Sequence, residues 1–381
     1  MFKTTLSRSS MRRNYSDIES SKSMVQNTQN PESKATIFEL SSKSGRQSFE
    51  TFRAALTAYE VFDTLEDQLA ELLVTRSPKL RSNPEGLAEA VSRELGAEGW
   101  SHKGCWAWYP WSRSLVRILN EEDFIELRTN RNRNKITAKE QRELREKTIG
   151  IVGLSVGSAF AMCLAMERTC GALKVADFDD LELSNLNRIQ TGIKNLGLPK
   201  WIAISRAIAE VDPYFEVEVY SRGLTSSNAS DFFDGLDLVC DACDQVSAKA
   251  LIRFEARKAE IPVLMETSDR GMLDIERYDQ GVEGYLHGRI SEEMLNDMMN
   301  ANEWSPEFFN AFIDLSQASA RGIKSLEEVG TTLVGWPQLY SDVAAGGAHA
   351  TQAARKILLG DPAPDARLYL EWDEQFVESI D

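Results

Sequence analysis

A short segment with two glycines, GLSVG at 153–157, lies between two apolar runs. Gly153 and Gly157 let the backbone come close to a ligand, while Ser155 stands where a dinucleotide-binding loop usually has a middle glycine. A helix that starts after such a loop offers unpaired N–H groups and the positive end of its dipole. The segment therefore predicts a phosphate site, although its spacing alone does not identify the nucleotide.

An acidic residue follows at the end of the next apolar run, where DFDDLELSNLNR begins with Asp177. It stands about two dozen residues after the glycines, where an acid commonly holds the ribose hydroxyls of a bound nucleotide. We assign Asp177 and Asp179 to the same nucleotide site. Read alone, DFD could also be the metal-binding DxD of a sugar transferase, but that interpretation leaves the glycine segment unexplained.

Cations and a third acid complete the set of residues that could do chemistry. Arg188 ends the acidic segment and Lys200 ends GLPK, close to a predicted helix start. Cations there suit a polyphosphate better than the pocket of a dehydrogenase. Asp244, in DACDQ, is a suitable ligand for Mg²⁺ that bridges phosphates.

These residues lie where strands and helices alternate, from Thr148 onward. Buried apolar strands joined by helices predict an α/β fold with a doubly wound, mostly parallel, Rossmann-like sheet. The carboxyl ends of its strands would bring the charged residues to one edge. We expect strands at 149–153, 173–177, 215–220, 236–241 and 262–267, an antiparallel strand at 273–278, and helices at 155–166, 200–211, 248–260, 291–315 and 342–359.

The chain divides into three predicted parts. Residues 1–47 are rich in Ser, Asn, Gln and Lys and predict a disordered tail, whose basic start resembles a transit peptide or is an ordinary basic tail. Residues 48–128 predict a small α+β accessory unit that could bind a partner or a peptide, and residues 129–381 predict the nucleotide-binding domain. The accessory unit is expected to hold helices at 48–74, 84–95 and 121–128 and strands at 105–112 and 115–119.

Composition excludes several classes of function. The chain has 381 residues with 43 Lys and Arg against 59 Asp and Glu, a net charge of −16, which disfavours non-specific binding to nucleic acid. The three histidines have no zinc-site spacing. Three tryptophans near the N-terminal strands are expected in a core, with a ligand platform as the alternative: Trp106, Trp108 and Trp111.

The five cysteines predict free thiols in a reducing compartment, so we expect a cytoplasmic protein. Cys240 and Cys243 form a lone CxxC, which we interpret as two buried strand-end cysteines rather than a zinc or redox site. The run 148–166 carries no formal charge and is long enough to span a membrane. Its glycines and serines favour a soluble strand and helix, so no membrane insertion is expected.

In this order, GLSVG, DFDDLELSNLNR, GLPK and DACDQ, with a late helix after WPQL, resemble the ubiquitin-activating-enzyme-like family of ThiF, MoeB and HesA. The resemblance covers about residues 130–362. It implies an adenylating domain, often dimeric, that uses ATP and Mg²⁺. Such a domain converts a carboxylate, commonly a protein or peptide C-terminus, into an acyl-adenylate with loss of pyrophosphate. A homodimer and a carboxylate-bearing protein or peptide substrate are therefore expected.

The resemblance also implies roles for individual residues. Asp177 resembles the family's ribose-binding acid, and Asn185 and Arg188 resemble its phosphate-contacting pair. Lys200 resembles the phosphate lysine, and Asp244 the acid on the magnesium side.

Upstream of the glycine segment, RTNRNRN resembles the family's arginine-bearing segment, which reaches the γ-phosphate, often from a neighbouring subunit. Either Arg131 or Arg133 fits that position. Asp269 and Arg270 follow a strand end and either face the acceptor or form a salt-bridged loop.

One departure from the family pattern bears on the mechanism. Many members carry an acceptor cysteine and a zinc site after DxxD, but no cysteine stands between Asp244 and Asp381. We therefore expect adenylylation without a cysteine thioester step. The alternatives are a non-catalytic scaffold with the same fold and an NAD- or FAD-binding oxidoreductase, which would leave Arg188, Lys200 and Asp244 unexplained.

Overall fold

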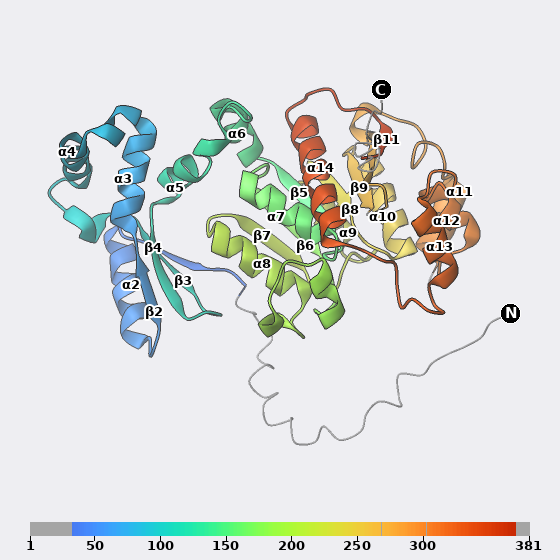
Figure 1. Cartoon of the computed structure of the whole chain (residues 1–381), viewed down its shortest axis with the longest axis horizontal. Helices are drawn as coiled ribbons and strands as arrows, with labels where there is room; N and C mark the ends of the chain where they lie inside the picture. The colour runs from blue at the N-terminus through green and yellow to red at the C-terminus, as the bar shows by residue number, and fades with distance from the viewer. Residues whose placement is uncertain (1–32, 268, 302, 371–381) are drawn as a thin grey trace, which may run out of the picture.

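The computed structural model describes residues 33–267, 269–301 and 303–370 (Figure 1). The basic start of the chain and most of the predicted tail lie outside the described residues. The described chain contains a four-stranded sheet and a seven-stranded sheet. The four-stranded sheet and its helices form the accessory unit at the left of Figure 1, and the seven-stranded sheet is the centre of the larger part.

The larger sheet confirms the predicted doubly wound, mostly parallel topology. Its strand order is β11-β10-β9-β8-β5-β6-β7. Strands β5 to β9 are parallel, β10 is antiparallel to β9, and β11 is antiparallel to β10. The chain runs outward from β5 through β6 and β7 and then returns to place β8 on the other side of β5. Ligands bind at the carboxyl ends of strands at such a switch point. The strands are β5 Thr148–Val152, β6 Ala172–Ala176, β7 Glu216–Tyr220, β8 Leu238–Asp241, β9 Val263–Thr267, β10 Met272–Glu276 and β11 Ala366–Leu368.

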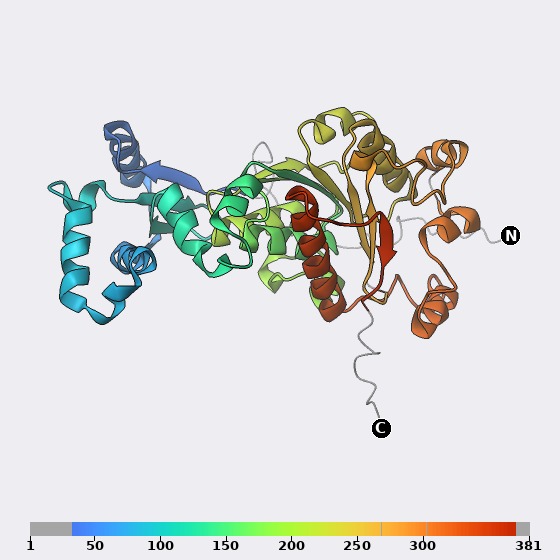
Figure 2. The same ribbon diagram turned by 90° about the horizontal axis from the view of Figure 1, so that it is seen from above.

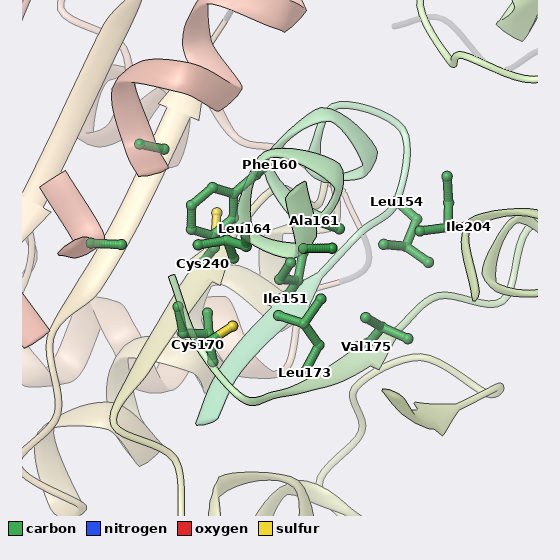
Figure 3. Packing of buried hydrophobic residues seen from close by; sticks show 14 of the residues in the cluster. Ile151, Leu154, Phe160, Ala161, Leu164, Cys170, Leu173, Val175, Ile204 and Cys240 are labelled. Carbon is green, nitrogen blue, oxygen red and sulfur yellow. The ribbon is translucent and has the colours of Figure 1, made fainter. Parts of the chain in front are cut away.

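Helices cover both faces of this sheet, because successive strand residues point to opposite faces and buried apolar residues lie on both. On β8, Leu238 and Cys240 pack with the first helix layer, and Val239 packs with the second. Figure 3 shows the first core, where Phe160 and Leu164 meet Ile151 and Cys240. The first layer is α7 Gly157–Glu167, α8 Lys200–Val211 and α14 Tyr340–Leu358, and the second is α9 Ala229–Phe233 and α10 Val246–Lys258, with α11 Glu292–Met299 and α12 Pro306–Phe312 beyond it.

Two tryptophans of the accessory unit pack inward. Trp108 is buried, and Trp106 stacks on Phe49 with ring centroids 5.5 Å apart, so both belong to a core rather than to an open ligand platform. Trp111 donates a hydrogen bond of 2.6 Å to Glu210 of α8, which joins the unit to the larger part. Its elements are β1 Thr36–Glu39, α2 Lys43–Ala55, β2 Glu60–Asp63, α3 Leu65–Arg76, α4 Pro84–Leu95, β3 Cys105–Tyr109, β4 Ser114–Ile118 and α5 Glu121–Arg128.

Two predictions about the N-terminal region are wrong. The tail was expected to run through residue 47, but β1 and the start of α2 occupy residues 36–47. The single helix expected at 48–74 is interrupted by β2, which pairs with β4. Arg113 donates to the carbonyl of Ala58 at 2.9 Å, in the connection between α2 and β2. The boundary between residues 128 and 129 stays a prediction.

The prediction of one helix at 291–315 is also wrong, because this segment forms two helices, α11 and α12. Ser305 accepts a hydrogen bond from the Phe308 amide at 3.1 Å, and Pro306 follows as the first residue of α12. A helix N-terminus therefore lies inside the expected helix. Two further helices were not expected, α6 Ala138–Arg145 and α13 Ala320–Glu328.

The uncharged run 148–166 is divided between β5, a loop and α7. In the part of the chain that the structure describes, no helix combines the length and apolar character needed to cross a membrane.

A buried ion network lies at the carboxyl end of β8. Asp241 is fully buried and binds Lys249 at 2.9 Å and Arg253 at 2.7 Å, both from α10. Arg253, also fully buried, binds Glu276 of β10 at 2.9 Å. Burial alone would raise the pKa of Asp241, but the two cations hold this pKa below its usual value. The network therefore keeps Asp241 charged and ties β8, α10 and β10 together.

We predict that Arg253→Met lowers the free energy of unfolding by about 3–5 kcal/mol, because Asp241 and Glu276 lose a buried partner. Urea unfolding monitored by circular dichroism measures this loss. The matched control is Lys258→Met on the same helix, whose exposed pair with Glu255 at 3.2 Å contributes at most about 1 kcal/mol. Equal losses in the two variants would contradict the prediction.

Candidate active site

The glycine segment forms a tight loop between β5 and α7. Gly153 has φ +92°, and a Cβ there would lie 2.4 Å from the Ala242 carbonyl oxygen of the loop after β8. A Cβ on Gly157 would lie 2.8 Å from Ile151, so the first turn of α7 packs directly on β5. Both glycines are needed for close packing, and the loop lies at the switch point between β5 and β8.

Asp177 holds this loop in place. Its side chain is buried, and its carboxylate accepts hydrogen bonds from the Leu154 amide at 2.6 Å and the Asp179 amide at 2.8 Å. Burial raises its pKa, and the two amides oppose that rise. Each oxygen has a further lone pair, so the carboxylate can position the loop and still accept a ligand hydroxyl.

Of the two predicted phosphate cations, Arg188 contacts this loop and Lys200 pairs with Asp179. Arg188 donates from Nε to the Ser155 hydroxyl at 2.9 Å, which gives a physical reason for serine in place of a middle glycine. Lys200 begins α8, and its ammonium group binds Asp179 at 2.7 Å. The Lys200 side chain is 7% exposed and that of Asp179 is 53% exposed, so the lysine is buried and the aspartate is in contact with solvent.

Asn185 shapes the turn that carries Arg188. Its side-chain oxygen accepts a hydrogen bond from the Glu182 amide at 3.0 Å, and its carbonyl accepts one from the Arg188 amide at 3.0 Å. The side chain is buried. Its role in this structure is to fix the 3₁₀ turn Leu183–Asn187.

Asp244 and Asp241 differ sharply, although both belong to DACDQ. Asp241 is taken up by the ion network, whereas Asp244 is exposed. Among the described residues, no hydrogen bond or ion pair reaches the Asp244 carboxylate, while its backbone carbonyl accepts from the Trp304 indole at 2.9 Å. Asp244 is therefore the acid available to a metal ion.

The lone CxxC lies at the carboxyl end of β8. Cys240 is buried and Cys243 is half-buried, and both are free thiols. No group of three or more possible metal ligands occurs among the described residues. The prediction of a buried strand-end cysteine is therefore confirmed for Cys240 only.

Arg131 and Arg133 lie away from the other predicted site residues. Asn132, between them, donates to the Glu167 carbonyl at 2.9 Å, at the C-terminal end of α7. The glycine loop precedes the opposite end of this helix, which spans 11 residues, about 16 Å at 1.5 Å per residue. Within one chain, the structure does not bring either arginine to the loop.

Residues 129–273 match the model of the ThiF family. The chain carries a ThiF family domain. It includes the glycine loop, Asp177, Arg188, Lys200 and Asp244, which the sequence motifs assigned to a nucleotide site.

Three relatives illustrate this similarity. The chain is 42% identical over 269 residues to "Uncharacterized protein MT1398" of Mycobacterium tuberculosis (strain CDC 1551 / Oshkosh), a match covering 70% of this chain and 38% of that protein. It is 30% identical over 138 residues to the tRNA threonylcarbamoyladenosine dehydratase of Bacillus subtilis (strain 168), and this match covers 35% of this chain and 54% of that protein. It is 30% identical over 140 residues to the adenylyltransferase and sulfurtransferase MOCS3 of Drosophila virilis, and this match covers 36% of this chain and 30% of that protein.

These matches span 38%, 54% and 30% of the three relatives, so much of each relative has no counterpart in the matched part of this chain. Among solved structures, the tRNA N6-threonylcarbamoyladenosine dehydratase of E. coli, in complex with ATP, is similar at 20% identity with a TM-score of 0.44. That similarity covers 62% of this chain and 95% of that one.

Next to β9 of the ThiF domain, Asp269 and Arg270 form structural contacts. The Asp269 carboxylate accepts from the Ser319 hydroxyl at 2.6 Å and from the Ser319 amide at 3.0 Å. Arg270 donates to the Gln317 carbonyl. Both residues therefore hold the segment before α13.

One unusual acid of the ThiF domain has no motif in the sequence. Glu266, near the carboxyl end of β9, is 7% exposed, and neither oxygen has a hydrogen-bond partner among the described residues. Burial and the charge of Asp342 raise its pKa to about 8. In the sequence it is a polar residue at the end of an apolar strand, which gives no signal of this environment.

We predict that Gly153→Ala lowers the free energy of unfolding by about 2 kcal/mol more than Gly235→Ala, as measured by urea unfolding. Gly235 also has positive φ, +70°, but no atom lies within 4 Å of a Cβ there, so it reports backbone strain alone. Gly153 adds the clash with Ala242, and overpacking costs roughly 1–3 kcal/mol. Equal losses would show that this close approach is unimportant.

We also predict a pH dependence of stability from Glu266. Its folded pKa of about 8 lies above the usual glutamate value of 4.5, so the folded state binds the proton more tightly than the unfolded state. This tighter proton binding stabilises the folded state, and the stabilisation is fully present below pH 4.5. As pH rises toward 8, the free energy of unfolding falls by roughly 1.4 kcal/mol per pH unit. Glu266→Gln should flatten this slope in unfolding measured from pH 5 to 8. An unchanged slope would contradict the prediction.

Proposed function

We propose that this protein uses ATP and Mg²⁺ to adenylylate a carboxylate, on a protein or peptide C-terminus or side chain, giving an acyl-adenylate and pyrophosphate. The observation that carries the proposal is that Asp177 and Arg188 both contact one glycine loop at the switch point, while Lys200 pairs with Asp179, whose amide binds Asp177. This arrangement suits a nucleotide polyphosphate. The ThiF family match and a relative named as an adenylyltransferase support it.

In the proposed reaction, a carboxylate oxygen of the substrate attacks the α-phosphorus of ATP. A C–O–P linkage forms, and the bond between the α-phosphorus and the bridging oxygen breaks as pyrophosphate leaves. No general base is needed, because the attacking group is already an anion. Asp177 accepts the ribose hydroxyls, while Arg188 and Lys200 neutralise charge that moves toward pyrophosphate.

Asp244 fits a role in holding Mg²⁺. It is an exposed carboxylate without a salt bridge to any described residue, whereas Asp241 is neutralised by Lys249 and Arg253. A site with one protein carboxylate suits Mg²⁺, which keeps several waters and binds substrate phosphates. Bound there, the ion would neutralise charge on the phosphates.

A cysteine thioester is not part of the proposed mechanism. No cysteine follows Cys243, and Cys243 is half-buried with a pKa raised well above the usual thiol value by burial. The adenylate would pass instead to a partner's nucleophile, to an amine, or to a group within the bound substrate. The free thiols suit a reducing compartment such as the cytoplasm.

The proposed enzyme is a homodimer. Arg131 and Arg133 are exposed at the far end of α7 from the glycine loop, so either could reach phosphates only in a second copy of the chain. A monomeric mass in light scattering, across a concentration series with ATP present, would contradict this arrangement.

Nucleic acid is not the proposed substrate. One relative is named as a tRNA-modifying dehydratase, but this chain has a net charge of −16, which opposes binding to a phosphate backbone. A protein or peptide carboxylate requires no such basic surface.

We predict that Arg188→Ala and Lys200→Ala each weaken ATP binding at least tenfold, because a charge-assisted contact contributes roughly 1.5–3 kcal/mol. Calorimetric titration with ATP and Mg²⁺ measures this, and Asp177→Ala should also lose binding. The matched control is Lys194→Ala, an exposed cation of the same segment, which should bind like the wild type.

The same titration with NAD⁺ and NADH separates the alternatives. Binding of nicotinamide nucleotides in place of ATP would support an oxidoreductase. Binding of neither would support a non-catalytic scaffold. If Arg188→Ala and Lys200→Ala bind ATP as tightly as the wild type, the proposed site is wrong.

A further inference from the structure

A cavity of about 320 Å³ lies at the end of α7 that is far from the glycine loop. Its walls come from α5 of the accessory unit, the 3₁₀ turn Asn130–Asn132, α6 and the residue that caps α7, at the junction of α5, α6 and α7 in Figure 1. Its volume falls within the range of small-molecule pockets, roughly 300–1,000 Å³. We call it the arginine cavity, because four arginines line it: Arg133, Arg142, Arg145 and Arg168.

The inner wall of the arginine cavity carries a buried positive charge in excess. Arg168 is 3% exposed and binds the fully buried carboxylate of Asp212 at 2.6 Å. Arg128 of α5 binds the same carboxylate at 2.9 Å. Arg128 also donates to the carbonyls of Ala165 and Met166 at the end of α7, but these groups carry only partial charge. One carboxylate therefore faces two guanidinium groups, and one positive charge is left without an acid.

The acids in the wall of the cavity already have partners. Glu122 binds Arg145 at 2.7 Å, and Glu126 binds Arg76 at 2.6 Å. The other two arginines of the cavity, Arg133 and Arg142, are exposed. Within the part of the chain that the structure describes, no hydrogen bond or ion pair reaches either of these side chains. Two guanidinium groups at the cavity are therefore available to an anion.

The charge and the lining of the cavity select a class of ligand. A guanidinium group presents a planar fork of N–H donors that matches phosphate oxygens. A phosphate monoester carries about −1.5 to −2 charges at pH 7, so it matches two available arginines better than a carboxylate with a single charge does. Ile125 and Ile136 also line the cavity, and they offer apolar surface to the rest of the ligand.

We propose that the arginine cavity binds a compact phosphate monoester. The phosphate lies among Arg133, Arg142 and Arg168, and the organic group packs on Ile125 and Ile136. Such a ligand contacts α5 of the accessory unit and α6 of the ThiF domain, and it thus connects the two parts of the chain.

The site is separate from the proposed nucleotide site, which lies at the other end of α7. It also distinguishes two arginines that sequence motifs leave equivalent. Arg133 lines the cavity, whereas Arg131 does not. Arg131 is then the arginine left for the phosphates of a second copy of the chain.

The test is calorimetric titration of the full chain at pH 7 with phenyl phosphate as the probe. We expect the wild type to bind phenyl phosphate at least tenfold more tightly than benzoate, phenol or inorganic phosphate. Arg142→Gln should weaken phenyl phosphate binding about tenfold or more, because it removes a charge-assisted contact. The matched control is Lys139→Gln, which removes an exposed cation from the same helix outside the cavity and should bind like the wild type.

ATP binding on the same samples separates this site from the proposed nucleotide site. Arg142→Gln should bind ATP and Mg²⁺ like the wild type, and Lys200→Ala should bind phenyl phosphate like the wild type. Absence of phenyl phosphate binding, binding that survives Arg142→Gln, or equally tight benzoate binding would overturn the proposal. Loss of phenyl phosphate binding in Lys200→Ala would also overturn it, because the probe would then occupy the nucleotide site. A wild type that binds phenyl phosphate but not ATP would support the cavity site and refute only the proposed adenylylation.

Discussion

The ion network at the end of β8 is the constraint on which the active edge of the ThiF domain depends. Asp241 is fully buried at the strand end, and it stays charged only because Lys249 and Arg253 approach it from α10. The same Arg253 reaches Glu276 on β10. Its guanidinium also lies 4.6 Å from the ring of Phe312 in α12. A single buried cation thus links the parallel sheet, its antiparallel extension and the helices beyond it.

Fixing the end of β8 also fixes the loops that follow. The Ala242 carbonyl lies against Gly153, so the loops after β8 and β5 must be placed together. Asp177 then binds the glycine loop from the end of β6. Three strand ends therefore position one another through a buried acid, a glycine and backbone amides. Arg188 and Asp244, to which the proposed function gives ligand contacts, lie outside this set; Arg188 is half-buried and Asp244 is exposed.

The parallel sheet and the motif positions could be predicted because each buried strand is an apolar run that ends in charged residues, as at Asp177. The hydrogen-bond partners of the motif residues could not be predicted, since contacts such as that of Arg188 with Ser155 depend on the path of a 3₁₀ turn. The distance of Arg131 from the loop depends on the direction of α7. Strand β2 was missed because its residues are exposed and lack apolar alternation. The burial of Glu266 could not be predicted either, because its carboxyl group packs against Gly346, which comes much later in the sequence.

The two sides of the carboxyl edge differ in charge. On the side of β6 and α8, Arg188, Lys200 and the start of α7 offer positive charge. On the side of β9, Glu266 is buried without a hydrogen-bond partner among the described residues, and its pKa of about 8 keeps it mostly protonated near neutral pH. A polyphosphate is therefore attracted to the first side, and the buried acid of the second side adds little charge that would oppose it.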